Sequence, residues 1–266
     1  GGPTVAAVID RMRRAPYAGR LREQFGRDVF DRGEAAFDAA ALALEVFQQS
    51  PADFYPFSSR YDAVLRGQAT LTEQERHGLA LFNDPAKGNC ASCHPSDVRP
   101  DGAFPLFTDF GHIAIGVPRN PSIKANADPR FHDLGLCGPL RTDLADRPEY
   151  CGRFRTPSLR NVALRPRHFH NGAVATLAQA VRFYVQRDID PVRWYGSAAR
   201  RYDDLPARYH ANVDTEPPFA LEYPEDRLRA ETGLLDEVGF TGTGPLADRL
   251  WGRPSITVLA IDCTRV

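Results

Sequence analysis

The sequence predicts an all-α fold in which a few helices are separated by long irregular segments. Several stretches repeat apolar residues at the helical spacing of i, i+3, i+4 and i+7. The sequence has no run of useful length that alternates apolar and polar residues, so no sheet is predicted. Residues 95–167 are rich in proline, glycine, aspartate and asparagine, which favours loops. Loops of this length need an anchor, so we expect them to wrap around a bound group.

The first two helices are expected in the N-terminal fifth of the chain. The first runs from residue 4 to Gly26, which ends it. Its apolar positions are Val5, Val8, Ile9 and Met12. The second covers residues 34–49 and is stopped by Pro51. Its inner face is expected to carry Phe37, Ala40, Leu44 and Phe47. Residues 51–67 contain proline and serine and are predicted to form a connector.

Two further helices are marked by N-terminal capping signals. Thr72, followed three residues later by Glu75, has the capping-box pattern, and the helix that it opens leads to a pair of cysteines. Thr176 with Gln179 opens another helix, which runs to about residue 187. The apolar stripe of this helix consists of Leu177, Ala180, Val181 and Tyr184. The spacing therefore places the tyrosine on the inward face.

Size and charge restrict the possible functions only loosely. With 266 residues and 42% hydrophobic content, the chain can hold one large domain or two small ones. The formal net charge of −1 provides no basic field for nucleic acid, which is not expected as a partner. No apolar run approaches the roughly 20 residues that cross a bilayer, so no membrane span is predicted. Residues 1–4 carry no signal-peptide pattern.

The most specific motif is Cys-x-x-Cys-His at Cys90, Cys93 and His94. Two thiols three residues apart reach the two vinyl groups of a haem, and the adjacent histidine then lies under the iron. A redox dithiol or half of a zinc site would use a similar cysteine pair. The dithiol needs a βαβ context and the zinc site needs a second ligand pair, and neither is visible. We therefore predict one covalently attached haem c.

The remaining cysteines are Cys137, Cys151 and Cys263. The first two bracket a segment rich in turn-forming residues and have no histidines at metal-binding spacing, so a disulfide is the better interpretation. In an oxidising compartment it would close a loop of about 15 residues, which contributes on the order of 3 kcal/mol in the chain-entropy model. Cys263 is either a buried thiol or a sign of an unusual C-terminal tail, and we assign it no function.

Several motifs together resemble those of a known family. The first group covers residues 71–75, 78–82, 90–94, 107–110 and 116–118. The most specific motifs are FRTPSLRNV at 154–162, FHNG at 169–172 and the Thr-Leu pair at 176–177. These motifs resemble the C-terminal haem domain of the di-haem cytochrome c peroxidases of the MauG type. The resemblance implies a cytochrome c-type haem domain over about residues 71–215.

The resemblance also predicts how the chain is divided. Residues 1–70 resemble the closing helices of the family's N-terminal haem domain, and residues 216–266 form a tail. Family members carry an earlier Cys-x-x-Cys-His motif that this sequence does not contain. We therefore expect a fragment or one piece of a split protein, without peroxidase turnover of its own. The tail lacks the closing amphipathic helix of the family, and its apolar run at 255–261 predicts a strand or a buried coil.

The sixth ligand of the iron, opposite His94, is inferred from the resemblance. Methionine is usual at the electron-transferring haem of these peroxidases, but the only methionine here is Met12, far upstream. In the family the ligand lies eight residues after the threonine that opens the helix, which is Tyr184 here, and MauG uses tyrosine. The alternative is a buried tyrosine whose hydroxyl bonds to a carbonyl. A phenolate would favour ferric iron and lower the reduction potential.

Other site residues are weaker candidates. His170 matches a family histidine near the haem and could bond to a propionate, or it could fix a turn. Arg160 could pair with a propionate, or it could form a structural ion pair. His168 is expected to be exposed. The family binds calcium between its two haem domains partly through backbone carbonyls that correspond to residues 165–167, so calcium is a further candidate ligand.

Three functional hypotheses follow. In the first, the parent protein is a peroxidase that reduces hydrogen peroxide with electrons from a protein or small-molecule donor, and this haem relays or stores electrons beside a second haem domain. In the second, the chain is a stand-alone mono-haem c-type cytochrome that carries electrons. In the third, it is a split subunit that exposes apolar inner faces of its first two helices where a partner docks. Because attachment of haem c implies export, we expect a periplasmic protein.

Overall fold

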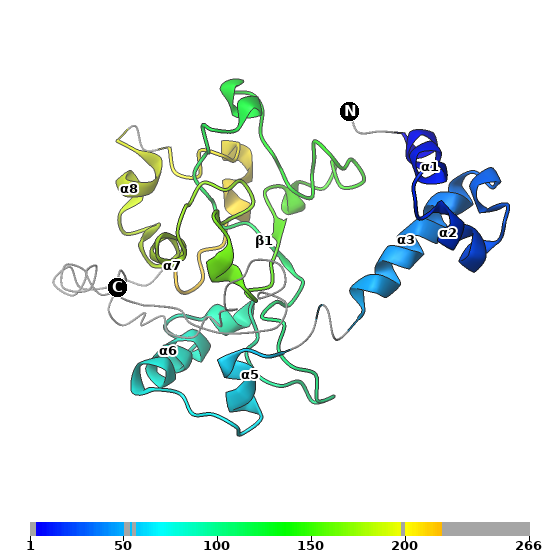
Figure 1. Ribbon diagram of the computed structural model, residues 1–266. Helices are drawn as coiled ribbons and strands as arrows, with labels where there is room; N and C mark the ends of the chain where they lie inside the picture. The colour runs from blue at the N-terminus through cyan, green and yellow to red at the C-terminus, as the bar shows by residue number, and fades with distance from the viewer. Residues whose placement is uncertain (1–3, 51–53, 55–56, 198–199, 220–266) are drawn as a thin grey trace. The chain divides into compact units, whose positions relative to one another are not determined.

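The computed structural model describes residues 4–50, 54, 57–197 and 200–219 (Figure 1). The chain divides into two compact units, Gly1–Pro56 and Phe57–Val266. This division falls after residue 56, whereas the sequence placed it after residue 70. The predicted apolar run at 255–261 and Cys263 lie outside the described residues. Within the described part, no helix is long and apolar enough to cross a membrane.

The first unit is helical. Its elements are α1 (Val5–Arg13), α2 (Ala18–Phe25), the 3-10 turn η1 (Val29–Asp31) and α3 (Glu34–Gln48). The prediction of one helix over residues 4–26 is wrong, because the chain turns between α1 and α2. Pro16 lies in this turn, and proline can neither donate a helical hydrogen bond nor avoid a clash with the preceding turn. The predicted helix at 34–49 is confirmed.

The packing of α3 differs from the prediction. Its buried residue is Ala36, with Ala39 and Ala40 partly buried against the same core. The core also contains Ile9, Met12, Ala18, Val29 and Phe30. Small side chains at this contact leave no room for large ones, which lie on the other faces of the helix. The large apolar residues exposed on α3 are Phe37, Leu42, Leu44, Val46 and Phe47. Phe37, Leu44 and Phe47 therefore do not form the predicted inner face.

The second unit begins with two short helices that lie side by side, drawn in cyan in Figure 1: α5 (Arg60–Leu65) and α6 (Glu73–Asn83). Both open with a capping box, from Ser59 in α5 and from Thr72 in α6. The second of these caps is the predicted one. Helix α5 was expected to be part of a connector, but Tyr61 on it is buried in a cluster with residues of the second unit. Residues 57–70 therefore belong to this unit.

The loops between α6 and the next long helix are irregular, as predicted. Their short elements are η2 (Cys90–Ser92), β1 (His112–Ile113), η3 (Lys124–Ala127), η4 (Pro148–Tyr150), β2 (Phe154–Arg155) and η5 (Val162–Leu164). β1 and β2 pair antiparallel, with His112 opposite Arg155. In the described part of the chain, the regular elements other than this two-residue pairing and a few isolated β-bridges are helices.

The predicted disulfide between Cys137 and Cys151 is confirmed. Cys151 has no exposed surface, so the bond anchors the loop to the interior. Close by, Gly135 has a φ of +59°, and a Cβ added there would lie 2.1 Å from the carbonyl oxygen of Arg153. Only glycine fits this close backbone approach. The disulfide and this contact hold the loop around residues 135–137 against residues 151–153, which lead into β2.

Helix α7 (Leu177–Gln186) is the predicted fourth helix, and α8 (Pro191–Tyr195) and the 3-10 segment η6 (Ala207–Asn212) follow it. The hydroxyl of Thr176 accepts a hydrogen bond from the Gln179 N–H at 3.2 Å, which confirms the predicted cap. Phe183 on α7 is fully buried. This side chain fixes the rotation of α7 and thereby the direction of the residues beside it.

Candidate functional site

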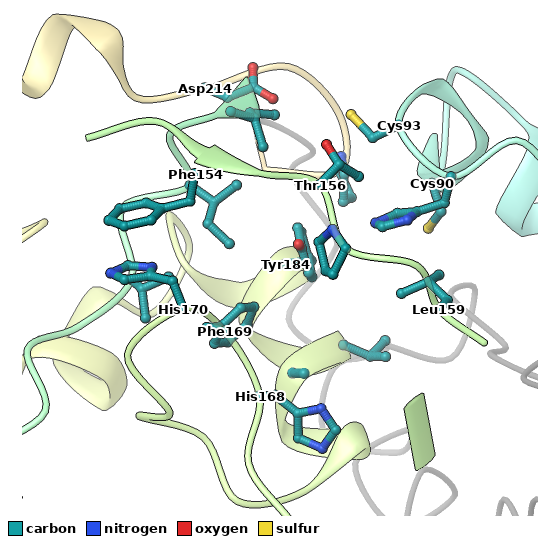
Figure 2. Close-up of a pocket in the computed structure, with 18 of the residues that line it drawn as sticks. Cys90, Cys93, Phe154, Thr156, Leu159, His168, Phe169, His170, Tyr184 and Asp214 are labelled. Atoms are coloured by element: carbon teal, nitrogen blue, oxygen red, sulfur yellow. The ribbon is translucent and has the colours of Figure 1, made fainter. Parts of the chain in front are cut away.

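A cavity of about 410 Å³ lies in the second unit, between η2, the β1–β2 pair and α7. Cys90, Cys93, His94 and Tyr184 all line it, although about 90 residues of sequence separate the first three from the tyrosine. Its apolar walls include Ile113, Ile115, Val117, Leu159, Val162 and Val181. Figure 2 shows the two cysteines on one side of the cavity and His170 on the other, with Tyr184 between them. A flat apolar group that carries a metal fits such a lining.

The cysteine motif folds into a tight turn. The His94 N–H donates to the Cys90 carbonyl at 2.8 Å, and Asn89, with a φ of 48°, precedes the turn. This turn places both thiols and the imidazole on the wall of one cavity. Burial raises the pKa of the Cys93 thiol. Among the described residues, no group of three or more histidine, cysteine or acidic side chains is arranged so that it could hold a metal ion.

His94 is oriented by the backbone. Its Nδ1 lies 2.7 Å from the carbonyl oxygen of Phe107. Because a carbonyl only accepts, Nδ1 carries the proton, which leaves the lone pair of Nε2 for a metal. Burial lowers the pKa of His94, although the hydrogen bond to Phe107 opposes this shift. A neutral imidazole with a fixed tautomer is the form that ligates a metal.

Tyr184 differs from three other tyrosines of this unit whose side chains are buried or partly buried. The hydroxyls of Tyr61, Tyr195 and Tyr202 donate hydrogen bonds to Ser96 O, Gly116 O and Asp188, respectively. Within the described residues, the Tyr184 hydroxyl has no such partner, so its alternative role as a carbonyl-bonded core tyrosine lacks the expected bond. Its ring packs against Phe219, with the ring centroids 5.2 Å apart. The side chain is thus held in place while its hydroxyl stays available.

Arg187, which follows Tyr184 by three residues, does not line the cavity, but it bonds backbone carbonyls of residues that do, and sequence reasoning missed it. It has no exposed surface, pairs with Asp188, and donates to the carbonyls of Ile115 and Asp214 at 3.1 and 2.8 Å. Burial raises the pKa of the Tyr184 phenol, and the guanidinium of Arg187 opposes this shift. The only sequence signal was a charged residue on the buried side of an amphipathic helix.

Two further histidines line the cavity. The ring of His170 stacks on Phe154 with centroids 3.5 Å apart, and its Nε2 lies 3.8 Å from Asp204 Oδ2 (Figure 2). His168 is 7% exposed, so the prediction that it is exposed is wrong. Its backbone N–H donates to the Val174 carbonyl at 2.8 Å, which turns the side chain inward. Burial lowers the pKa of His168, and the nearby Arg165 lowers it further.

Arg160 does not line the cavity in the described structure. Its Nη1 and Nη2 donate to the two carboxylate oxygens of Asp62 at 2.9 and 2.8 Å, and Asp62 has no exposed surface. The structure therefore shows the alternative, a structural ion pair, and the propionate role of Arg160 stays a prediction. The arginines that do line the cavity are Arg155, Arg165 and Arg167. Sequence reasoning named residues 165–167 only for their backbone carbonyls and proposed none of these three side chains as a haem partner.

Two further sequence observations concerned metal ligands: the position of the single methionine and the possible calcium site. Met12, the only methionine of the sequence, is buried in the core of the first unit. Calcium ligation by the backbone carbonyls of residues 165–167 stays a prediction, because no contact in the structure tests it.

Comparison with known proteins gives a consistent set of relatives. No family model matches the chain. The chain is 38% identical over 187 residues to the methylamine utilization protein MauG of Paracoccus denitrificans, which covers 68% of this chain and 46% of that protein. It is 29% identical over 231 residues to the cytochrome-c peroxidase IdrP1 of Denitromonas iodatirespirans, covering 78% and 57%.

A solved structure agrees with these relatives. The crystal structure of the diheme peroxidase BthA from Burkholderia thailandensis matches with a TM-score of 0.74 and 40% sequence identity, covering 83% of this chain and 54% of that one. The chain thus spans about half the length of the relatives that it matches. The motifs, the fold and the alignments lead to one assignment: this chain belongs to the family of MauG and the di-haem cytochrome c peroxidases.

Proposed function

We propose that the chain binds one haem c, which Cys90 and Cys93 would hold through thioether bonds and whose iron His94 and Tyr184 would ligate. The observation that carries the proposal is that all four residues line the same apolar cavity. His94 offers Nε2 because its Nδ1 is bonded to Phe107. The Tyr184 hydroxyl has no other partner in the described chain.

The ligand pair determines the kind of redox chemistry that the site favours. When bound, haem supplies reversible one-electron chemistry at iron. An anionic phenolate oxygen from Tyr184 stabilises ferric iron and so lowers the reduction potential. Such a site accepts electrons poorly from an ordinary carrier and stores an oxidising equivalent well. This character favours a role in a MauG-like enzyme over that of a stand-alone electron carrier.

For the whole protein we propose a di-haem peroxidase that reduces hydrogen peroxide with electrons from a protein or small-molecule donor. Reduction to two waters consumes two electrons and two protons, which suits a protein with two linked redox centres. The given sequence contains one Cys-x-x-Cys-His motif, so the second haem would be held by a part of the protein outside this sequence. The large apolar residues exposed on α3 support a docked partner domain, since soluble surfaces rarely expose such patches without function.

We propose a periplasmic location. Haem attachment at Cys90 and Cys93 takes place outside the cytoplasm, and the disulfide between Cys137 and Cys151 fits an oxidising compartment. Calcium bound by backbone carbonyls of residues 165–167 is part of the same proposal for the complete protein.

The test of haem attachment is an intact-mass measurement after expression in a host with a cytochrome c maturation system. We expect 29.5 kDa plus one haem. A Cys90→Ala, Cys93→Ala double variant should lose the covalent haem. Ser92→Ala is the matched control, because it changes the same turn and keeps both thiols. A chain that matures without added mass would overturn the proposal.

The second test addresses the peroxidase. We expect the haem-loaded chain alone to oxidise a dye with peroxide no faster than free haem. Adding the missing haem domain of the same protein should produce turnover. Turnover by the chain alone, well above free haem, would contradict the proposed division of roles.

A further inference from the structure

Three successive backbone carbonyls next to the proximal histidine are held by side chains. The Pro105 carbonyl accepts from Arg160 Nε at 2.9 Å and from Nη2 at 2.6 Å. The Leu106 carbonyl accepts from Ser158 Oγ at 2.7 Å. The Phe107 carbonyl is the partner of His94 Nδ1, also at 2.7 Å. The orientation of the His94 ring therefore depends on how segment 105–107 is fixed.

The backbone of this segment is strained where it meets His94. Phe107 has a φ of 52°, in the left-handed region that a bulky residue rarely adopts. Such a conformation is energetically unfavourable and persists only where its surroundings hold it. Its side chain is 5% exposed, and the next residue, Thr108, donates to the Thr156 carbonyl at 2.7 Å. Residues 156–160 thus hold the segment from one side.

Arg160 makes the strongest of these connections. Its guanidinium bonds both oxygens of the fully buried Asp62. It also lies over the Phe107 ring, with Cζ 5.4 Å from the ring centroid. Asp62 is itself fixed, because it accepts from the Ser59 N–H at 3.0 Å. The guanidinium has a planar fork of donors, and a lysine ammonium cannot reproduce its simultaneous bonds to a carboxylate and a carbonyl.

We propose that Arg160, paired with Asp62, is a positioning residue for the proximal ligand: it holds segment 105–107 so that the Phe107 carbonyl stays bonded to His94, and it thereby keeps the haem potential low. This inference rests on the proposed ligation of haem by His94. A hydrogen bond from Nδ1–H to a carbonyl gives the imidazole more anionic character and makes it a stronger donor to ferric iron. Loss of this bond would therefore stabilise ferrous iron and raise the potential.

The test is a potentiometric titration of the haem-loaded chain and its variants. Loss of a hydrogen-bond partner of a metal ligand typically changes metal affinity or activity about 10- to 100-fold. For Arg160→Lys we expect at least a tenfold rise in the ferrous-to-ferric ratio at a fixed potential, which for one electron is an upward shift of about 59 mV. Ser158→Ala removes the bond to the Leu106 carbonyl and the bond that Ser158 Oγ accepts from the Arg160 backbone N–H at 3.1 Å, but it keeps the guanidinium bonds to Pro105 and Asp62. It should therefore produce a smaller shift of the same sign. It also serves as the second variant if Arg160→Lys does not fold.

Arg60→Lys is the matched control. Arg60 likewise bonds a carboxylate, Glu75, at 2.8 Å and a backbone carbonyl, that of Thr70, at 2.9 Å, but neither partner belongs to segment 105–107. The reduction potential of the haem in the Arg60→Lys variant should equal that in the unaltered chain. If haem is attached and the potentials of Arg160→Lys and Ser158→Ala are both unchanged, the positioning role is wrong and Arg160 is purely structural. If the unaltered chain carries no covalent haem, the proposed function itself fails, and this inference fails with it.

Discussion

Replacement of Tyr184 by phenylalanine tests the proposed sixth ligand most directly. The change removes one hydroxyl and keeps the aromatic ring, whose packing against Phe219 and Phe183 holds the side chain in α7. The position of the helix should therefore be retained. The expected result is a ferric haem that is five-coordinate or binds water in place of the phenolate.

The hydrogen bonds of each hydroxyl determine how much its removal should change the free energy of unfolding. The Tyr184 hydroxyl has no partner in the described chain, so its removal breaks no protein hydrogen bond. The matched control is Tyr195→Phe, which removes a hydroxyl bonded to the Gly116 carbonyl at 2.5 Å. Loss of such a bond costs about 1 kcal/mol, because the partly buried Gly116 carbonyl loses its hydrogen-bond donor. The control should therefore change the free energy of unfolding and leave the haem ligands in place.

The assay compares the ferric absorption and EPR spectra of the two variants with those of the unaltered haem-loaded chain, together with urea denaturation. Tyr184→Phe should change both spectra and raise the reduction potential, since the anionic oxygen is lost. Tyr195→Phe should reproduce the original spectra and unfold at lower urea concentration. Unchanged spectra in Tyr184→Phe would refute tyrosine ligation, whatever the control shows.

Three further predictions concern the framework of the site, all measured by urea denaturation. Replacing Cys137 and Cys151 by serine should lower the free energy of unfolding by about 3 kcal/mol, from a closed loop of about 15 residues; an equal midpoint would show that the loop is held without the bond. Thr176→Ala removes the cap of α7 and should cost about 1 kcal/mol, whereas Thr176→Ser should cost little. Burial alone would raise the pKa of Asp62, but hydrogen bonds from Arg160 and Ser59 lower it below its usual value of 3.8. The ionised carboxylate therefore stabilises the fold above that value, and this contribution is lost as the pH falls towards the lower folded pKa. In Asp62→Asn this acid-dependent loss should be reduced; an unchanged pH profile would rule out this contribution.

The features that the sequence predicted correctly depend on residues close together in the chain. The caps at Thr72 and Thr176 join residues three apart, and the inward position of Tyr184 follows from the period of one helix. The pairing of Cys137 with Cys151 spans a separation of 14 residues and was favoured because the alternatives lacked partners. Even so, the single helix predicted for residues 4–26 was wrong, because Pro16 interrupts the helix although the apolar periodicity continues on both sides of it.

Tertiary structure decided the features that depend on contacts between distant segments. Arg160 finds Asp62 98 residues away, and no local pattern distinguishes that partner from a haem propionate. His168 is turned inward by a backbone bond to Val174, although neighbouring residues are exposed. The apolar residues of α3 were predicted to face inward, yet the smaller alanines make its contact with the core. By itself, the sequence determined the haem-attachment motif, the helices that frame the site and the family resemblance, because each is encoded over a short stretch. The partners of buried charges and the faces that pack were set only when the folded backbone brought distant donors and acceptors within bonding distance.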